Sequence, residues 1–511
     1  MDSMKKYKFI PIIAIFLIGI YQLLDPSPSV LTIKSKTPQI VVDLCQFLEE
    51  KLFGVEAEYE NIKKFNLKGL VVVFRHGERS PIIPLVNLTP ELEEKLFGVE
   101  AEYESIKKFN LKGLVVVFRH GERSPLLPLV NLTPELGNSV SIPDCSAFHN
   151  IDRKSFENYI ELINSKDFRS FIKTDHPRSQ NDWHPDRSKC SEGNITAEGA
   201  LQIVRLGNYL RNKYSNTGLF DGKNVDIGMF SSYYQRTFQS AIAFISSFFY
   251  PDKGKIGKIN LKWSNTTYFC MNQDCTCSKI AKFRKDFEDA RSKLYFHKYS
   301  ELSDELDKFC AEMTIPKVLH PLSFVDAILG RYACRRIPFP CFTNKNCLTL
   351  EKFSQVVDAA AELIHQMAPL SKPLRKLFVA ESFPISQTIA TISRKLRKSE
   401  NSNQIRIFSA HDVTIVPFIF TLGLNATKRN PPYGSRLIFE IYQLKDKSII
   451  NDSVFIRVLL NGVDYTKNLQ FCKNFYSGLC PARHFESFVR SSLFQDITNY
   501  QSITDMCNAK D

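Results

Sequence analysis

The chain has 511 residues, of which 43% are hydrophobic and 24% charged, the composition of a globular protein with a core large enough for one large domain or two smaller ones. Its formal net charge is +13, but Lys and Arg are spread along the chain and often neighbour Asp or Glu. This scatter indicates a generally basic surface, which favours acidic substrates and argues against the basic stripe of a nucleic-acid-binding protein.

An uncharged, mostly apolar segment, Phe9–Leu24, follows three lysines near the start of the chain. A helix of this segment would be roughly 24 Å long, enough for a thin bilayer. A cleaved signal peptide is the alternative, but no small-x-small cleavage site follows the segment. The sequence predicts a cytosolic tail at 1–8, an uncleaved signal anchor at 9–24 and a lumenal stem at 25–48, since positive charge before the span keeps the N-terminus in the cytosol.

Thirteen cysteines and six glycosylation sequons agree with a lumenal location. The sequons are at Asn87, Asn131, Asn194, Asn265, Asn425 and Asn451. The cluster CMNQDCTC, Cys270–Cys277, lacks the paired C-x-x-C or His spacing of a zinc knuckle, so disulfides are favoured there over a metal site. The odd total leaves at least one thiol unpaired or intermolecular.

Residues 49–92 and 93–136 are two copies of one segment and differ at three positions. Repeat proteins need several units to share a core, so a single doubling indicates duplication of one coding segment or an error of gene assembly. In each copy the run LKGLVVVF is apolar and rich in β-branched residues, which predicts a fully buried parallel strand. The motif RHGERSP follows at the carboxyl end of that strand, where open α/β sheets bind their ligands.

RHGERSP places two guanidinium groups and one imidazole on a short turn, as Arg119, His120 and Arg123 in the second copy. Gly121 permits a tight turn, and Pro125 stiffens its exit. Two guanidinium forks suit a phosphate, and their charge disfavours protonation of the imidazole, which leaves a neutral, nucleophilic His. A basic surface loop is the alternative for an isolated Arg-His pair, but it does not account for the whole pattern after a strand.

A strand followed by RHGxRxP resembles the signature of the histidine acid phosphatase family, which is branch 2 of the histidine phosphatase superfamily. The family's second signature, an HD pair after a strand, is matched by His411 and Asp412. Asp412 as a helix N-cap is the alternative interpretation of that residue. The segment 231–241 resembles the family's Arg-Ser-Thr-x-x-x-Arg-Thr pattern, but its first Arg is replaced, so only Arg236 remains as a candidate to hold the phosphate. The amphipathic segment 195–214 resembles a family helix, which we interpret as scaffolding.

The resemblance implies a phosphomonoesterase that needs no metal and no cofactor. It implies His120 as the nucleophile and Asp412 as the proton donor to the leaving alcohol. Because the donor must hold a proton, we expect a mildly acidic working range. The residues implied to hold the phosphate oxygens are Arg119, Arg123, Arg236 and His411. The first copy offers the alternatives Arg75, His76 and Arg79.

The surroundings of the two copies favour the second as the working one. The family has an Asp-Cys pair shortly after its RHG loop, and Asp144–Cys145 follows the second copy, whereas the first copy runs into its own repeat. Cys45, before the first copy, instead matches a family Cys that precedes the strand. Since one central strand position is available, continuity with the downstream segments leads us to predict a phosphatase domain at 93–511, with 49–92 as the displaced duplicate.

For the fold, the resemblance implies an α/β architecture with a mostly parallel sheet flanked by helices and a smaller inserted helical cap at about 251–347. The segment 284–309 is charged and amphipathic, as expected of a cap helix. The apolar residues of 348–368 recur at the spacing of three and four that is typical of a helix.

Further similarity to the family lies in PPYGSRLIFEIYQ (431–443), VLLNGVDYT (458–466) and FPCFTNKNC (339–347). With the anchor, it implies a single-pass type II protein of the Golgi membrane that removes the 2-phosphate from xylose in the linkage region of proteoglycans. A broad-specificity acid phosphatase or an inositol polyphosphate phosphatase is the alternative. An inactive phospho-ligand-binding protein is the third hypothesis, because one family Arg is missing.

Overall fold

The structure is a computed structural model of the whole chain. It describes residues 108–126, 153–179, 182–185, 191–220, 225–271, 277–312, 321–334, 339, 347–370, 372–398, 402–424, 430–445 and 452–509. The predicted tail, anchor, stem and first RHG copy, with Arg75, His76 and Arg79, lie outside these residues. The sequons at Asn87, Asn131, Asn425 and Asn451 lie outside them as well.

The strands of the described residues form one sheet in the order β2-β4-β3-β5-β1-β6-β7-β8, with β9 paired to β7. The strands from β2 to β1 run parallel, and β6 to β9 are antiparallel additions. The bounds are β1 (Phe109–Arg119), β2 (Ile172–Thr174), β3 (Val225–Ser232), β4 (Ile259–Ser264), β5 (Asn403–Ala410), β6 (Arg436–Leu444), β7 (Val454–Leu460), β8 (Val463–Asp464) and β9 (Cys480–Pro481). The predicted α/β sheet is confirmed, with its parallel part confined to five strands.

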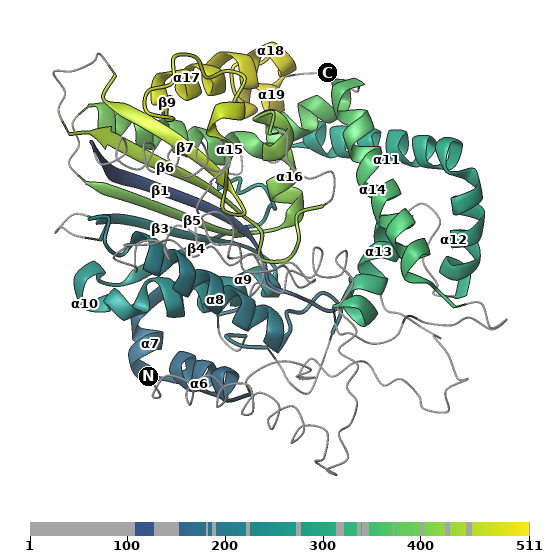
Figure 1. The fold of residues 1–511 in the computed structure, drawn as a ribbon, viewed down its shortest axis with the longest axis horizontal. Helices are drawn as coiled ribbons and strands as arrows, with labels where there is room; N and C mark the ends of the chain where they lie inside the picture. The colour runs from purple at the N-terminus through teal and green to yellow at the C-terminus, as the bar shows by residue number, and fades with distance from the viewer. Residues whose placement is uncertain are drawn as a thin grey trace, which may run out of the picture. The chain divides into compact units, whose positions relative to one another are not determined.

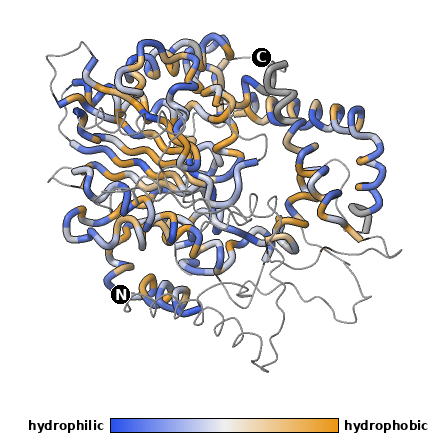
Figure 2. Tube along the Cα trace, viewed as in Figure 1, coloured by the Kyte–Doolittle hydropathy of each residue, from blue (hydrophilic) through white to orange (hydrophobic). Residues whose placement is uncertain are grey.

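The apolar run of the second copy forms β1, which lies between β5 and β6 in the middle of the sheet (Figure 1). Leu114, Val116 and Phe118 face one side of the sheet, and Val115 and Val117 face the other, because side chains alternate along a strand. All five are fully buried. Figure 2 shows the hydrophobic residues running along these central strands. A strand with both faces covered requires such an uninterrupted apolar sequence.

Helices cover both faces of the sheet (Figure 1). On the face of Leu114 lie α6 (Arg153–Asn164), α7 (Lys166–Phe171), α8 (Ala197–Tyr214) and α9 (Gln235–Phe248), followed by η1 (Tyr250–Asp252) and α10 (Lys253–Ile256). On the face of Val115 lie α15 (Lys372–Arg397), α16 (Asp412–Thr421), α17 (Ala482–Ser487), η6 (Phe488–Leu493) and α19 (Ile503–Asn508). The short elements η5 (Thr466–Asn468) and α18 (Gln495–Thr498) precede α19 in the chain. The hydrophobic core therefore has two halves, one on each face of the sheet, and β1 contributes side chains to both.

A third cluster of buried residues belongs to a group of helices inserted between β4 and β5. These are α11 (Ser278–Lys298), α12 (Ser300–Glu312), α13 (Leu322–Ile328), η4 (Leu329–Ala333) and α14 (Leu350–Leu370). The range predicted for the cap, 251–347, also contains β4, which is a strand of the main sheet. The alternating pattern of INLKWS, with Ile259 and Leu261 buried, explains why this segment joins the sheet. The helical insertion thus begins with α11.

Disulfides join Cys277 with Cys507 and Cys472 with Cys480. The first ties the start of α11 to α19, and Cys270 is also disulfide-bonded. The expectation that the Cys270–Cys277 cluster forms disulfides is confirmed for its two described cysteines. Among the described residues, no group of three or more His, Cys, Asp or Glu side chains is arranged to hold a metal. Within the same residues no helix is long and apolar enough to cross a membrane.

Candidate active site

The two sequence signatures meet where β1 and β5 end. These strands are parallel neighbours, and Arg119 is in register with Ala410. The backbone N–H of His120 donates to the carbonyl of Ala410 at 2.9 Å. His120 and His411 therefore leave the sheet side by side, with ring centroids 5.4 Å apart. Segments nearly three hundred residues apart in the chain form one site at the carboxyl edge of the sheet, as expected for an open α/β fold.

His120 is buried and has the geometry of a nucleophile. Its Nδ1 donates to the carbonyl of Gly121 at 2.8 Å, which leaves the lone pair on Nε2. Burial, and then the positive charges of Arg236 and Arg119, hold the pKa of His120 well below its ordinary value. The imidazole is therefore neutral at physiological pH, as the sequence predicts, although burial contributes more than the neighbouring arginines.

The backbone of the RHG loop is fixed by α8. A Cβ atom on Gly121 would lie 2.0 Å from the carbonyl oxygen of Gly199, so only two glycines allow this contact between loop and helix. The N–H of Glu122 donates to Oε1 of Gln202 at 2.9 Å, and its carbonyl accepts from the N–H of Thr196 at 2.9 Å. Thr196 is also the N-cap of α8. The helix interpreted as scaffolding thus positions the nucleophile's loop directly.

Arg119 connects the RHG loop to the HD signature. Its Nη1 donates to the carbonyl of Pro431 at 2.6 Å, and its Nη2 forms an ion pair with Oδ2 of Asp412 at 3.2 Å. Its guanidinium also packs on the ring of Tyr433, with Cζ 4.2 Å from the ring centroid. The Nε has no hydrogen-bond partner among the described residues. Arg119 thus retains a donor for a further acceptor.

Arg123 is held by a residue of the helical insertion. Its guanidinium donates to both oxygens of the Asp326 carboxylate, at 2.6 and 3.3 Å. Asp326 lies on α13 and also accepts the N–H of Leu126 at 2.8 Å. A Cβ atom on Gly330 would lie 3.1 Å from the backbone of Pro125, so the turn after α13 packs closely on the loop. The insertion is therefore in direct contact with the RHG loop.

Arg236 enters the site from the first turn of α9. Burial, and then the charge of Arg123, lowers the pKa of Arg236 to about 10, so that it stays charged at physiological pH. Its guanidinium packs on the ring of Tyr234, with Cζ 4.3 Å from the centroid. Because Arg236 is the strongest charge acting on both His120 and His411, the structure places it with them.

His411 is the N-cap residue of α16. Its Nε2 hydrogen-bonds Oγ of Ser232 at 2.7 Å, and Ser232 in turn hydrogen-bonds Thr237 at 2.8 Å. Burial, and then the charge of Arg236, holds the pKa of His411 well below its ordinary value, although Asp412 acts in the opposite direction. The second histidine is therefore also neutral, and its Nε2 is engaged by Ser232.

Asp412 is the first residue of α16 and not its N-cap. Burial alone would raise the pKa of Asp412, but the positive charges of Arg119 and Arg123 lower it below its ordinary value. The lowered pKa of Asp412 favours its ionised carboxylate. The mildly acidic working range expected from the need for a protonated donor stays a prediction, because the paired Arg119 stabilises the charged form of the carboxyl group.

Exposed apolar side chains lie next to the site residues in the chain. Leu126, Tyr233, Tyr234 and Val413 are 47%, 41%, 43% and 49% exposed. Leu126 ends the described part of the RHG loop, and Val413 follows Asp412 directly. The ring of Tyr234 lies edge-on to that of His411, with centroids 5.2 Å apart. Apolar surface therefore borders the charged site.

The structure brings together all six predicted residues of the second copy: Arg119, His120, Arg123, Arg236, His411 and Asp412. The sequence analysis missed three further side chains in contact with them. These are Asp326, Ser232 and Tyr433. Asp326 belongs to no motif, Ser232 lies in the segment 231–241 that was noted for Arg236, and Tyr433 lies in a segment noted only for its similarity to the family.

Two of the predicted glycosylation sites lie in the described residues. Asn265 is exposed after β4. Asn194 is half-buried, and its backbone carbonyl accepts the N–H of Ser124 at 2.9 Å. A glycan on Asn194 would therefore stand beside the RHG loop. The use of either site remains a prediction.

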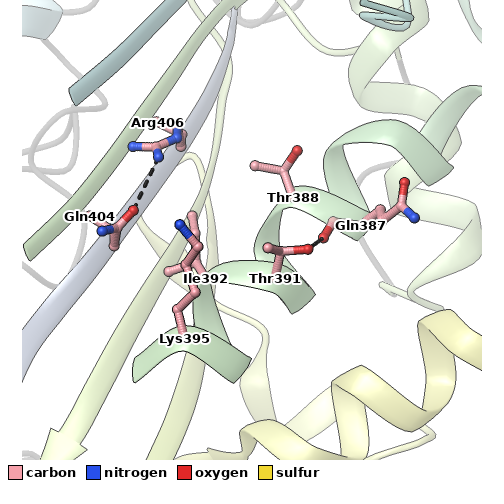
Figure 3. Close-up of a pocket in the computed structure, with 7 residues that line it drawn as sticks. All are labelled: Gln387, Thr388, Thr391, Ile392, Lys395, Gln404 and Arg406. Carbon is pink, nitrogen blue, oxygen red and sulfur yellow. Dashed lines mark hydrogen bonds between the residues drawn. The ribbon is translucent and has the colours of Figure 1, made fainter. Parts of the chain in front are cut away.

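A separate pocket of about 210 Å³ lies between α15 and β5 (Figure 3). It is lined by Gln387, Thr388, Thr391, Ile392, Lys395, Gln404 and Arg406. Gln404 and Arg406 are near the amino end of β5, whereas His411 follows the carboxyl end of that strand. Arg406 is already paired with Asp226, at 2.6 Å. This pocket is distinct from the site around His120.

The comparisons with known proteins agree with this site. A family model of the histidine phosphatase superfamily (branch 2) matches residues 110–461. The chain is 28% identical to 2-phosphoxylose phosphatase 1 of Danio rerio over 353 residues, which are 62% of this chain and 68% of that protein. It is 27% identical to the Homo sapiens protein of that name over 375 residues, 70% of this chain and 74% of that protein.

Among solved structures, the apo form of Hafnia alvei phytase is similar with a TM-score of 0.45 and 15% identity, over 76% of this chain and 98% of that one. The family model spans both β1 with its RHG loop and β5 with the HD pair. The chain therefore belongs to the histidine phosphatase superfamily (branch 2), and it is a phosphoric monoester hydrolase.

Proposed function

We propose that this protein is a lumenal, membrane-anchored phosphomonoesterase that works through a phosphohistidine intermediate and removes the 2-phosphate from xylose in the linkage region of proteoglycans. The observation that carries the chemistry is a buried, neutral His120 whose Nδ1 is held by the Gly121 carbonyl, beside three arginines. A nucleophile of this kind divides one difficult substitution into two easier ones.

In the first step, Nε2 of His120 attacks phosphorus, the bond from phosphorus to the leaving oxygen breaks, and that oxygen takes the proton of Asp412. Arg119, Arg123 and Arg236 carry the charge that the non-bridging phosphoryl oxygens require. The Nδ1–H of His120 keeps its hydrogen bond to the loop carbonyl, which stabilises the positive charge on the phosphorylated ring.

In the second step, water attacks phosphorus, the bond from phosphorus to Nε2 of His120 breaks, and the Asp412 carboxylate takes the water proton. This proton transfer returns Asp412 to the protonated form that the next turnover needs. The arginines that lower its pKa are also those that a phosphate dianion would pair with, so bound substrate reduces their effect on the carboxyl group. Binding of the phosphate therefore favours the protonated donor.

The xylose substrate is supported by the names of the relatives and by the apolar border of the site. Tyr234 and Val413 offer exposed apolar surface to a ring-shaped alcohol, and this surface would be of little use to a highly charged substrate. The choice between sugar and inositol phosphate therefore depends on what lies outside the phosphoryl site.

The test is a comparison of kcat/KM for the purified chain. The substrates are a xylose 2-phosphate glycoside of the linkage region, p-nitrophenyl phosphate and inositol hexakisphosphate. We expect the xylose compound to be preferred over both by about ten-fold or more. Equal rates with all three would instead indicate a broad-specificity acid phosphatase, and preference for the inositol compound would indicate an inositol polyphosphate phosphatase.

EDTA is expected to leave the rates unchanged, and loss of activity with chelator would contradict a metal-independent mechanism.

The location in the Golgi membrane as a single-pass type II protein is supported by the lysines that precede the apolar segment 9–24. A tag before Met1 should be cleaved by protease added to intact microsomes, and a tag after Asp511 should be protected. The reverse pattern of protection would contradict this topology.

A further inference from the structure

Tyr433 lies between the catalytic residues and the core of the helical insertion. Its ring packs on the guanidinium of Arg119, at 4.2 Å, and its centroid is 5.8 Å from that of the His120 ring. It belongs to the same buried cluster as Phe324 and Ala327 of α13. Its backbone is fixed by the neighbouring residue Gly434, whose N–H donates to the carbonyl of His120 at 3.2 Å. Tyr433 is therefore held against both the nucleophile and one of the arginines.

The hydroxyl group of Tyr433 is fully buried and has no hydrogen-bond partner among the described residues. Buried hydroxyl groups are almost always paired, since leaving one unpaired costs free energy. Burial raises the pKa of Tyr433, although the charges of Arg123 and Arg119 act against this, so the hydroxyl keeps its proton. It is thus a hydrogen-bond donor for which no described residue supplies an acceptor.

Other donors around His120 are also unpaired. The Nε atoms of Arg119, Arg123 and Arg236 are buried and have no partner among the described residues. The carboxylates nearby, Asp326 and Asp412, are already engaged with arginines. A site with unpaired donors and engaged acceptors fits a ligand that only accepts hydrogen bonds, and a phosphoryl group with its non-bridging oxygens is such a ligand.

We propose that Tyr433 is a further phosphate-binding residue, whose hydroxyl donates a hydrogen bond to a non-bridging oxygen of the phosphoryl group held by Arg119, His120 and Arg123. A phosphoryl oxygen would give the Tyr433 hydroxyl the acceptor that no described residue supplies. This role depends on phosphate binding and not on the identity of the alcohol, so it can be tested even if xylose 2-phosphate is not the substrate.

The test is Tyr433→Phe in the detergent-solubilised full chain, because this change removes the hydroxyl and keeps the ring that packs on Arg119. Inhibition constants for inorganic phosphate and for orthovanadate are measured against hydrolysis of p-nitrophenyl phosphate. We expect both to rise by about ten-fold to a hundred-fold, the effect of losing a hydrogen bond to a charged group. The midpoint of thermal unfolding without ligand should stay the same or rise, since an unpaired buried donor is removed.

Tyr159→Phe is the matched control. The Tyr159 hydroxyl is also buried without a partner among the described residues, and burial raises the pKa of Tyr159 as it does that of Tyr433. This variant should leave both inhibition constants unchanged. Unchanged constants in Tyr433→Phe would overturn the proposal. Weaker inhibition accompanied by a lower unfolding midpoint would also overturn it, because the hydroxyl would then support the fold.

Discussion

Arg123 of the RHG loop and Asp326 of α13 form an ion pair across 203 positions of the chain, with hydrogen bonds of 2.6 and 3.3 Å. The Arg123 side chain is 5% exposed and that of Asp326 18%, so the pair is largely withdrawn from water. The same carboxylate accepts the N–H of Leu126. One carboxylate of the insertion therefore holds the catalytic loop at two points, which couples the inserted helices to the chemistry.

Asp326→Ala is expected to lower the free energy of unfolding by about 2 to 4 kcal/mol, because Arg123 would be left as a buried, unpaired cation. Inorganic phosphate supplies a replacement anion, so it should raise the unfolding midpoint of the variant more than that of the wild type. Thermal unfolding with and without phosphate checks this. Asp226→Ala, which breaks the remote pair with Arg406, should show the wild-type response to phosphate. Equal responses in Asp326→Ala and the wild type would contradict the coupling.

Gly199→Ala should damage both stability and turnover. A Cβ atom there would lie 2.1 Å from the carbonyl oxygen of Glu122, which already accepts the N–H of Thr196. Relief requires a shift of the RHG loop, so we expect a loss of about 2 kcal/mol or more in urea unfolding and a lower kcat. Gly254→Ala is the control, because no atom of the described residues beyond its own stretch of α10 lies within 4 Å of its Cβ position. A stable, fully active Gly199→Ala would show that the loop is not fixed by α8.

Asp412→Asn should slow the reaction most for substrates whose leaving oxygen must be protonated. Turnover of a sugar phosphate should fall by about a hundred-fold to ten-thousand-fold, whereas p-nitrophenyl phosphate, whose alcohol leaves without a proton, should lose far less. Because the pKa of Asp412 is lowered, kcat/KM of the wild type for the sugar phosphate should rise as the pH falls from neutral to mildly acidic. Equal losses with both substrates would contradict the role of proton donor.

Glu381 provides a prediction about stability and pH outside the site. It is buried on α15 and paired with Arg284 of α11. Burial raises the pKa of Glu381 to about 7, although Arg284 acts to lower it. The pKa of Glu381 is higher in the folded protein than in the unfolded chain, so the protonated acid favours the folded state. This contribution to the free energy of unfolding is complete below the unfolded pKa, and it is lost as the pH rises towards 7.

Urea unfolding of the wild type should therefore show a decrease in stability of about 2 to 3 kcal/mol between pH 4 and pH 8 that is absent in Glu381→Gln. Since other groups also titrate, the difference between the two proteins is the quantity to measure. Parallel stability curves for the two proteins would show that Glu381 has no raised pKa.

The sequence contains the information for the parts of the site that lie at strand ends. The run before His120 predicts a buried strand, the run before His411 a second one, and parallel pairing of β1 with β5 places the two histidines together. The arginines of the motif predict that the pKa of His120 is lowered and the ring neutral. The structure agrees with this direction, although burial is the larger cause of the lowered pKa. These features depend on local patterns and on one topological rule.

The remaining parts depend on contacts between distant segments. Asp326 lies in VDAIL, where an Asp on a helix is usually solvated, and only its packing against Arg123 makes it part of the site. The lowered pKa of Asp412, which lies on α16, depends on Arg119 at the end of β1. The placement of β4 in the sheet depends on its pairing with β3 and was not recognised inside the predicted cap. No pattern within a short window of sequence contains these facts.

The central claim is that His120, from the second copy of the repeated segment, is the nucleophile, and trapping of the phosphoenzyme tests it most directly. The wild type, His120→Ala and His76→Ala are mixed with a radiolabelled phosphomonoester and quenched in denaturant. Label bound to protein is then examined for the acid-labile, base-stable bond of phosphohistidine. We predict label on the wild type and on His76→Ala and none on His120→Ala, because Nε2 of His120 forms the bond to phosphorus. Label retained by His120→Ala, or lost from His76→Ala, would contradict the account.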